Sequence, residues 1–460
     1  MTEQSSRETL ATRLGFIMLS AGCAIGLGNV WRFPFIVGKY GGGIFVFLYL
    51  FFLLVLGFPV LMTEMAIGRG GRSNLVGSFR NLATSHTVGW TWLARIMISG
   101  CFILMIYYTS VSGWLFAYTG YFARGVNTAF ASAESSGKFF DELTKSASRS
   151  SSYMLLATLL GSAICWYGVQ KGVEKYVKYM MSALIVLMVV LAGYALTTPG
   201  MREGLAFYLC PNWNNFTQKP LETVFAAMGQ AFFTLSLGVG SMTIFGSYLN
   251  WKKPLAKECG WIILLDTLVA LCAGFIVFPI CKSYNVDVGQ GPGLIFVSLP
   301  NIFNNIPLGR IWGTLFFLFM ALAALTTIVA VFENLIAYLQ DEYSFPRRKA
   351  TACVGLAVAM LSLPCVFGYN LLAFIKPLGG NSSILDFEDF IVSQNLLPLG
   401  ALAMTLFCFS KSGWGESKFM NELEEGQPWH IPSAIRIYWK YILPVVILLI
   451  FAMGYIQMFS

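Results

Sequence analysis

The sequence predicts an all-α integral membrane protein, and three observations support this fold class. Of its 460 residues, 57% are hydrophobic and only 11% are charged, whereas about 25% is typical of soluble domains. Apolar runs of about 20 residues, the length of a membrane-spanning helix, recur along the whole chain. The Lys and Arg residues gather in short loops between these runs. We therefore expect one transmembrane domain over residues 1–460, surrounded by the lipid bilayer of the cell membrane.

Eleven transmembrane helices are expected. The first apolar run is long and has no small-residue cleavage site, so it is predicted to remain as a span and not to be removed as a signal peptide. The expected spans are residues 12–37, 42–68, 89–123, 152–170, 177–197, 221–249, 257–284, 308–340, 348–371, 382–409 and 432–457.

The basic residues predict the orientation, because loops rich in Lys and Arg stay in the cytoplasm. The loops after spans 2, 4, 6 and 8 are of this kind. Their basic residues are Arg69, Arg72 and Arg80; Lys171, Lys175 and Lys178; Lys252, Lys253 and Lys257; and Arg347, Arg348 and Lys349. The N-terminus is therefore expected in the cytoplasm and, after eleven spans, the C-terminus outside. The net charge of +8 then reflects topology, and no nucleic-acid partner is expected.

Two longer segments between spans are expected outside the membrane. Residues 124–151 are polar and Ser-rich, with charges of both signs, and are predicted to form an external loop. Residues 285–307 are less polar and contain their own Gly and Pro residues. This second segment is either a structured loop that dips toward the membrane or a plain long loop.

Cysteine and histidine offer little chemistry in this sequence. The ten cysteines contain no CxxC pair and lie mostly in apolar runs, where Cys behaves as a small hydrophobic residue. Cys210 and Cys281 fall near outer helix ends and are the two that could pair. With only His86 and His430, neither a haem nor a His-rich metal centre is expected, and no organic cofactor is predicted.

Spans 1 and 6 contain residues that interrupt helices. Span 1 includes "AGCAIGLGN" and span 6 includes "GQAFFTLSLGVGS". One Gly-rich helix usually indicates close packing, and Gly22 and Gly26 have the spacing for it. Two such helices five spans apart suggest instead an inverted 5+5 repeat with both unwound in mid-membrane, as in transporters. The first repeat would be residues 1–200 (spans 1–5), the second 201–410 (spans 6–10), and 411–460 would add span 11.

Polar residues within the apolar runs suit a hard cation. Backbone, hydroxyl, amide and carboxylate oxygens are the ligands that such cations prefer. Asp266 is the clearest case, because a carboxylate in mid-membrane costs at least about 2.5–3.5 kcal/mol and needs a partner. Glu64 and Glu333 also lie in apolar runs, where each could instead join helices by hydrogen bonds. The other candidate cation ligands are Asn29, Thr234, Ser236, Thr326 and Thr327.

The chain resembles the neurotransmitter:sodium symporter family, in particular its bacterial amino acid transporters, over nearly its whole length. The matching motifs are "ATRLGFIMLSAGCAIGLGNVWRFPF" from Ala11, "GGGIFVFLYL" from Gly41, "EMAIGR" from Glu64, "IYY" at 106–108, "GQAFFTLSLGVGS" from Gly229 and "LTT" at 325–327. "GNVWRFP" followed by "GGG" is the most specific of them.

The resemblance implies two co-transported sodium ions. The first site would consist of the substrate carboxylate, the Ala24 carbonyl, Asn29, Thr234 and Asp266. The second would consist of the carbonyls of Gly22, Ile25 and Ala323 and the hydroxyls of Thr326 and Thr327.

The resemblance also implies the substrate site. The substrate carboxylate would meet the N–H groups of Leu27 and Gly28 and the Tyr108 hydroxyl. The ammonium would meet Ser236 and carbonyls around Ala24, Phe233 and Thr234. The side-chain pocket, which has no charged member, would be lined by Cys23, Leu104, Val239, Thr327 and Val331.

The gates follow from the same resemblance. Phe233 and Tyr108 would close a lid over the substrate. Arg32 with Asp389 would form the outer gate, and Arg7 with Asp341 the inner gate, near Tyr248.

Departures from the family pattern refine the expected function. Gly26 stands where monoamine carriers have Asp, so the substrate is expected to bring its own carboxylate. Asp266 stands where many members have Asn, and its charge is hypothesised to replace chloride. Leu10 replaces the Trp usual at the inner gate, and the chain has eleven expected spans where many relatives have twelve.

We therefore expect sodium-coupled uptake of a neutral, hydrophobic or aromatic amino acid by alternating access, without a chloride requirement. No Ser-His-Asp set or HExxH motif is present, so an enzyme is not expected. A channel is disfavoured by the paired charges at both ends. A sensor of the same fold that binds substrate without net transport is the alternative. A chain with so little mass outside the membrane could act as a monomer or weak homo-oligomer.

Overall fold

The computed structural model describes residues 10–125, 127–249, 253–286, 288, 293–380, 382–428 and 430–459. These ranges are built of helices, and the only extended pairing in them is an isolated bridge between Gly42 and Pro211. The all-α class predicted from the sequence is confirmed.

Eight helices in the described residues are long and apolar enough to cross a membrane. A ninth candidate is the bent pair Arg13–Ala24 and Gly28–Lys39, whose axes differ by 56°. The eight are Gly43–Gly71, Thr87–Arg124, Val169–Ala195, Leu255–Ser283, Gly309–Tyr343, Arg347–Phe367, Ile384–Phe409 and Ser433–Ile456. The two other expected spans are also helical, as α8 (Ala147–Trp166) and as the shorter pair α12 (Pro220–Thr234) and α13 (Ser241–Tyr248). The count of eleven spans stays a prediction.

The other expected spans are built from the following longer helices, in several cases from more than one element in succession. They are α1 (Arg13–Ala24), α3 (Gly43–Phe52), α4 (Phe58–Gly71), α6 (Thr87–Arg124), α9 (Lys175–Ala195), α14 (Leu255–Ser283), α16 (Gly309–Tyr343), α17 (Arg347–Phe367), α19 (Leu397–Phe409) and α22 (Leu443–Phe459).

Shorter helices and turns connect or continue them. These are α2 (Phe33–Lys39), α5 (Leu75–Leu82), α7 (Ala133–Lys145), α10 (Met201–Leu209), α11 (Trp213–Gln218), α15 (Leu299–Asn304), α18 (Ile384–Asp389), α20 (Glu416–Glu424) and α21 (Ser433–Ile437), with the π-helical turns η1 (Gly28–Arg32), η2 (Leu53–Gly57), η4 (Val169–Glu174), η5 (Leu294–Ser298), η6 (Phe390–Leu396) and η7 (Tyr438–Ile442) and the 3₁₀ turn η3 (Asn127–Phe130).

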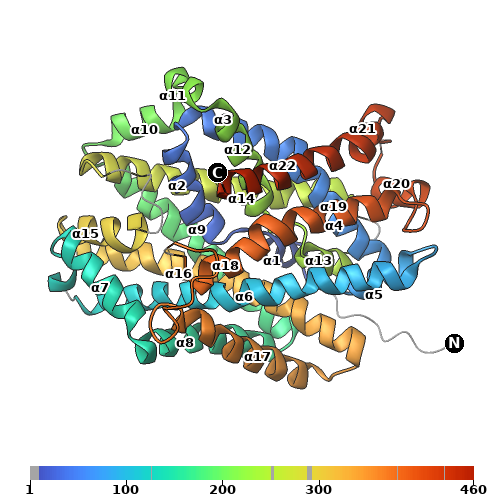
Figure 1. Ribbon diagram of the computed structural model, residues 1–460, viewed down its shortest axis with the longest axis horizontal. Coiled ribbons are helices and arrows are strands. Elements are labelled where there is room, and N and C mark those ends of the chain that lie inside the picture. The colour runs from blue at the N-terminus through green and yellow to red at the C-terminus, as the bar shows by residue number, and fades with distance from the viewer. Residues whose placement is uncertain are drawn as a thin grey trace.

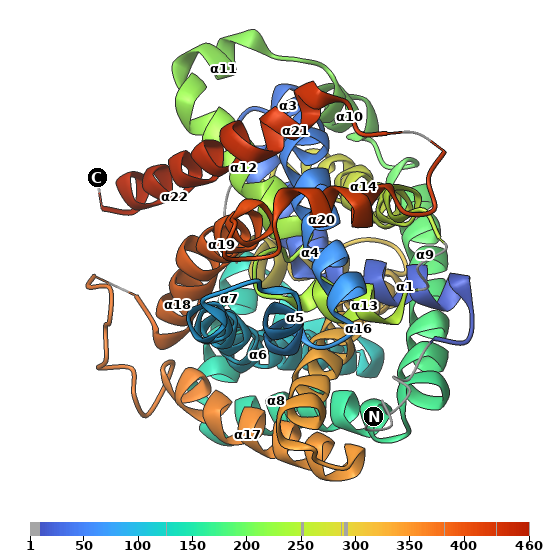
Figure 2. The ribbon, with the colours of Figure 1, turned by 90° about the vertical axis from the view of Figure 1, so that its right-hand side faces the viewer.

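The broken helices lie inside the bundle. Helix α1 packs against α16, α14, α9 and α13, and α13 packs against α4. Figure 2 shows α1, α4 and α13 near the centre, with α8 and α17 at one edge of the molecule and α22 toward another. Figure 1 shows α6 and α16 running through the bundle beside α8 and α17. The interruptions are therefore surrounded by other helices, which is where a membrane protein tolerates irregular backbone.

Both segments expected outside the spans contain helices. In 124–151 a capping box of Ser132 and Ser135 starts α7, which buries Phe139 and Leu143. In 285–307, η5 and α15 pack against neighbouring helices, and the Tyr118 hydroxyl donates a hydrogen bond to the Phe296 carbonyl at 2.6 Å. The second segment is thus structured and not a plain loop; that it dips toward the membrane stays a prediction. The first is helical and not an irregular loop, because its few apolar residues share one helix face.

The cysteines form no disulfide. All ten lie within the described residues and none is in a disulfide; Cys210 is exposed and Cys281 is buried. The pair that the sequence left open is therefore not bonded.

Candidate functional site

The first helix break follows directly from the glycine-rich sequence of span 1. Helix α1 ends at Ala24, and Ile25 leaves the helical conformation with φ −70° and ψ 94°. The chain resumes as η1 at Gly28, where the Gln230 side chain donates a hydrogen bond to the Gly28 carbonyl at 3.1 Å. Residues 25–27 thus interrupt the regular helical hydrogen bonding at the centre of the bundle.

The second break lies between α12 and α13. Ser236, Gly238 and Gly240 have φ values of +51°, +98° and +81°, in the left-handed region that favours glycine. A Cβ atom on Gly238 would lie 2.0 Å from the Leu397 carbonyl oxygen, so that position admits only glycine. The buried Glu64 carboxylate accepts hydrogen bonds from the N–H groups of Gly238 at 3.0 Å and Met242 at 2.9 Å. Glu64 therefore supplies hydrogen-bond acceptors to N–H groups at the buried start of α13.

An oxygen cluster joins the first break to α16. The Thr327 hydroxyl lies 3.3 Å from the Gly22 carbonyl oxygen, 3.2 Å from that of Ile25 and 3.3 Å from that of Ala323. The Thr326 hydroxyl bonds to the Ala323 carbonyl of its own helix at 2.9 Å. A hydroxyl has only one proton, so Thr327 cannot satisfy three carbonyls at once. The cluster is rich in acceptors and suits a cation.

A second oxygen cluster joins both breaks to α14. Asp266 is fully buried; its Oδ1 accepts from the Asn29 amide at 2.8 Å and its Oδ2 from the Thr234 hydroxyl at 2.9 Å. Within the described residues, no Lys, Arg or His forms an ion pair with this carboxylate. A buried carboxylate without a counter-charge is costly, and a bound cation would remove that cost.

A narrow cavity lies between the two breaks. Its volume is about 30 Å³, and it is lined by Ala24, Gly26, Leu27, Gly28, Leu104, Tyr108, Phe233, Ser236, Thr327, Val392 and Leu397. The Leu27 N–H donates to the Tyr108 hydroxyl at 3.2 Å. A Cβ atom on Gly26 would lie 2.6 Å from the Tyr108 oxygen and 2.8 Å from Thr327 Oγ1. Backbone polar groups can therefore reach the cavity only because residue 26 has no side chain.

The structure brings most of the sequence-predicted substrate residues to this cavity and leaves four apart. Cys23, Thr234, Val239 and Val331 are fully buried but do not line it. Val392 and Leu397 line it instead, although the sequence analysis did not name them. Val392 lies in η6 (Phe390–Leu396) and Leu397 begins α19. Nothing in the sequence distinguishes these two apolar residues from apolar neighbours that face elsewhere.

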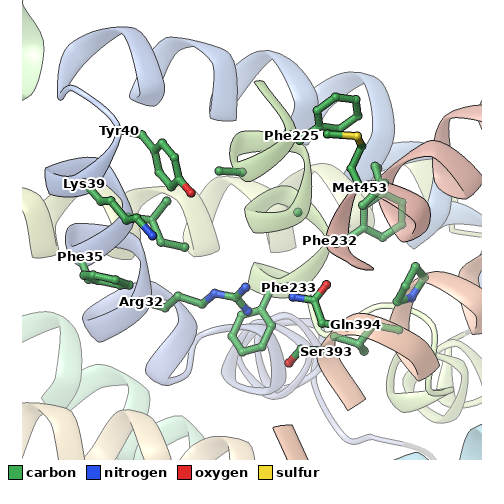
Figure 3. Close-up of a pocket in the computed structure, with 17 residues that line it drawn as sticks. Arg32, Phe35, Lys39, Tyr40, Phe225, Phe232, Phe233, Ser393, Gln394 and Met453 are labelled. Carbon is green, nitrogen blue, oxygen red and sulfur yellow. The ribbon is translucent and has the colours of Figure 1, made fainter. Parts of the chain in front are cut away.

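A larger cavity of about 210 Å³ opens beside the first (Figure 3). Phe233 and Leu397 line both cavities, so the Phe233 ring lies at their boundary. The Arg32 guanidinium lies over the Phe233 ring, 3.9 Å from its centroid, at cation–π distance. Arg32 and Asp389, both in the described part of the chain, form no ion pair within 4.0 Å; Asp389 instead accepts from Ser393 at 2.7 Å.

The residues expected at the inner gate lie at the opposite end of α16. The Tyr248 hydroxyl donates to Glu333 at 2.8 Å, and Glu333 pairs with Arg347 at 2.6 Å. Asp341 accepts from the Asn74 N–H at 2.7 Å and from the Ser73 hydroxyl at 3.0 Å. Arg7, the expected partner of Asp341, lies outside the described residues.

The oxygen clusters differ from transition-metal sites. In the described residues, no group of three or more His, Cys, Asp or Glu side chains is placed to hold a metal ion. The donors that do converge are carbonyl, hydroxyl, amide and single carboxylate oxygens, which are ligands for hard cations.

The comparisons with known proteins fit this geometry. A family model described as "Sodium:neurotransmitter symporter family" matches residues 7–131 and 141–460. The chain belongs to the sodium:neurotransmitter symporter family. Members of this family are sodium-coupled transporters and not enzymes, and the multi-pass helical architecture is consistent with a membrane protein.

Relatives from bacteria to mammals match over most of the chain. An uncharacterised sodium-dependent transporter of Bacillus subtilis (strain 168) is 31% identical over 96% of each chain. The sodium- and chloride-dependent GABA transporter 2 of Rattus norvegicus is 24% identical over 98% of this chain and 80% of its own. The crystal structure of MhsT in complex with L-phenylalanine superposes with a TM-score of 0.85 at 34% identity, covering 97% of this chain and 99% of the other.

Proposed function

We propose that this protein is a symporter that couples inward sodium movement to uptake of a neutral, hydrophobic or aromatic amino acid. The observation that carries the proposal is the convergence of the Gly22, Ile25 and Ala323 carbonyls on the Thr327 hydroxyl. These oxygens come from the first helix break and from α16, so a sodium ion between them would hold the two elements together.

The Asp266 cluster is proposed as the other sodium site, which is the first of the two expected from the sequence. It would comprise Asp266, Asn29, Thr234, the Ala24 carbonyl and the substrate carboxylate. Support comes from the carboxylate's burial and its two neutral hydrogen-bond donors. Because the substrate supplies one ligand, sodium and substrate would each favour binding of the other, which is the coupling that symport requires.

The cavity between the breaks favours an amino acid over an amine. The substrate carboxylate would meet Leu27 N–H, Gly28 N–H and the Tyr108 hydroxyl, and the ammonium would meet Ser236 and carbonyls near Phe233. Gly26 has no room for the carboxylate side chain that an amine would need as its partner. Leu104, Val392 and Leu397 offer apolar contact, and the structural neighbour was solved with phenylalanine.

Alternating access would be driven by the sodium ions. Two sodium ions moving through 100 mV provide about 4.6 kcal/mol, at about 2.3 kcal/mol per charge. This is enough for an amino acid gradient above a thousandfold even before the sodium gradient is counted. Phe233 with Arg32 would close the outer side, and Tyr248 with Glu333 the inner side.

Chloride is proposed to be unnecessary. Asp266 puts a fixed negative charge beside the first sodium site, where an anion would otherwise help to balance the ion. The bacterial relative is named sodium-dependent, whereas the rat relative is named sodium- and chloride-dependent. Replacing chloride with gluconate is expected to leave uptake unchanged, and a severe loss of uptake would contradict this part of the proposal.

The decisive experiment is uptake into proteoliposomes. A pool of labelled neutral amino acids is offered with an inward sodium gradient, and with potassium in its place. Accumulation is expected only with sodium, and the accumulated amino acid names the substrate. Asp266→Ala is expected to abolish it.

The matched control is Asp141→Ala. Asp141 is an exposed carboxylate that pairs with Lys145 on α7, so its removal should leave uptake intact. Binding without accumulation would identify a sensor instead of a transporter. Neither binding nor uptake across the pool would show that the proposed substrate class is wrong.

A further inference from the structure

A surface groove between α8 and α17 has no role in the proposed transport cycle. It is the largest of the cavities described here, about 610 Å³, and its walls are mainly apolar. The groove lies at the edge of the bundle where α8 and α17 pack side by side (Figure 2). Its lining residues are Leu155, Thr158, Leu159, Ser162, Ala163, Trp166, Tyr167, Thr351, Ala352, Gly355, Leu356 and Ala359.

Small side chains create the groove, and large exposed ones form its rims. Ala352, Gly355 and Ala359 recur on one face of α17, opposite Ala163 of α8. Leu159 and Leu356 are 65% and 60% exposed. On a helix that faces hydrocarbon, such a depression must be filled by something apolar, because it would otherwise lose dispersion contacts.

The end of the groove near Trp166 is basic. The Arg348 guanidinium lies over the Trp166 ring, 5.9 Å from its centroid. Lys349 is the next residue along α17. Lys171 lies in η4, just after α8. Turn η4 packs closely on α8, since a Cβ atom on Gly172 would lie 2.2 Å from the Ile164 carbonyl oxygen. The basic loops after spans 4 and 8 both predict that this end faces the cytoplasm.

These three cations have no acidic partner among the described residues. Arg348, Lys349 and Lys171 form no ion pair within 4.0 Å there, and the nearby carboxylates are already engaged. Glu174 accepts from the Ala11 and Thr12 N–H groups, and Glu333 pairs with Arg347. The basic end of the groove therefore presents uncompensated positive charge at the expected membrane surface.

We propose that this groove binds an anionic glycerophospholipid of the cytoplasmic leaflet. One acyl chain would fill the groove along Ala163, Ala352 and Leu356, and the phosphate would meet Arg348 with Lys171 or Lys349. An apolar groove alone would accept any lipid tail. The basic end makes the site selective for a negatively charged headgroup, since cationic pockets between helices on the cytoplasmic side attract such lipids.

The test is native mass spectrometry of the full chain in detergent, titrated with phosphatidylglycerol or phosphatidylcholine of identical acyl chains. Retention of one phosphatidylglycerol is expected at concentrations that leave phosphatidylcholine largely unbound. Arg348→Gln is expected to lower phosphatidylglycerol retention at least fivefold. The double variant Ala163→Phe/Ala352→Phe, which fills the groove, is expected to lower it equally.

The matched control is Arg149→Gln, which removes an arginine from the opposite end of the same helix, α8. It should retain phosphatidylglycerol as the unchanged chain does. A second readout uses phosphatidylglycerol with brominated acyl chains, which quenches nearby tryptophan fluorescence. A quenched component that disappears in Trp166→Phe supports the lipid's place in the groove.

Two results would overturn the proposal. If both lipids were retained equally and Arg348→Gln left their retention unchanged, lipid would surround this face without binding at a specific site. The chain could instead form a dimer that Ala163→Phe/Ala352→Phe dissociates without changing lipid retention. That result would mean that a second copy of the chain occupies the groove.

Discussion

Thr327 illustrates how single residues set the chemistry of this site. Its hydroxyl has one proton within reach of the carbonyl oxygens of Gly22, Ile25 and Ala323. The Ala323 carbonyl also accepts from the Thr326 hydroxyl at 2.9 Å, but the Gly22 and Ile25 carbonyls compete for the one Thr327 proton, so one of them goes without it in a buried place. Unpaired buried acceptors are costly, and a sodium ion would satisfy all of them together.

Replacing Thr327 with Val removes the hydroxyl at nearly constant volume. The sodium concentration for half-maximal uptake is expected to rise at least tenfold, equivalent to about 1.4 kcal/mol. Sodium titration of uptake in proteoliposomes measures this change. Thr405→Val is the matched control, because the buried Thr405 hydroxyl only bonds to Ala401 of its own helix. An unchanged sodium titration in Thr327→Val would argue against an ion at this cluster.

Gly26→Ala tests the space that the substrate carboxylate requires. The added Cβ would lie 2.6 Å from the Tyr108 oxygen and 2.8 Å from Thr327 Oγ1, distances that real Cβ atoms do not show. Uptake is expected to fall at least tenfold. Gly260→Ala, on α14 where a Cβ meets nothing within 4 Å, should leave uptake and thermal stability unchanged. Normal uptake by Gly26→Ala would place the substrate elsewhere.

At the scale of residues, the sequence marks polar groups more clearly than apolar ones. Asp266, Asn29, Thr234 and Thr327 stand out because a polar residue in an apolar run needs a partner, and the structure gives each one hydrogen-bond contacts. Apolar pocket residues carry no such signal. Cys23, Val239 and Val331 therefore fell outside the cavity, and Val392 and Leu397 were not named.

At the scale of elements, α13 depends on a side chain from another helix. The helix starts after Gly240, whose φ is +81°, and the Glu64 carboxylate of α4 accepts from Gly238 and Met242. This carboxylate supplies the cap that the broken span lacks, since an unpaired helix start must find acceptors.

Glu64→Gln is expected to destabilise the protein by about 1–3 kcal/mol, because the amide nitrogen would face a backbone N–H. Thermal unfolding in detergent can be monitored as the loss of the monodisperse protein peak. The midpoint temperature of unfolding should be lower in the variant. Glu134→Gln is the control, since Glu134 is exposed and pairs only with Lys138. An unchanged midpoint in Glu64→Gln would show that the cap contributes little to the stability of α13.

The elements that the sequence predicted least well are short. Helix α7 lies in a segment of mainly polar residues, where Phe139 and Leu143 alone mark its buried face. Helix α15 and turn η5 are apolar but too short to resemble a span. Their burial depends on neighbours far away in the sequence, such as the contact of Tyr118 with Phe296, and a local pattern does not contain that information.

At the scale of the whole molecule, a chain of contacts connects the second break to the expected cytoplasmic side. Tyr248 ends α13 and donates to Glu333 of α16, and Glu333 pairs with Arg347 of α17. Helix α13 belongs to the interrupted span, whereas α16 and α17 lie in the surrounding bundle. Opening toward the cytoplasm would require α13 to separate from α16, so the bond from Tyr248 should oppose that opening.

Tyr248→Phe is therefore expected to shift the population toward the state open to the cytoplasm. A hydrogen bond to a charged group contributes about 1.5–3 kcal/mol, so an increase in that population of at least about tenfold is expected. Hydrogen–deuterium exchange of the peptide covering α13 should become faster in potassium, and sodium with substrate should restore part of the protection. Tyr338→Phe is the control, because the Tyr338 hydroxyl lies beside the exposed Tyr343 at the end of α16. If α13 exchanged equally in both variants, the contact between Tyr248 and Glu333 would not restrain cytoplasmic opening, and the Arg347–Glu333 pair would become the element to test.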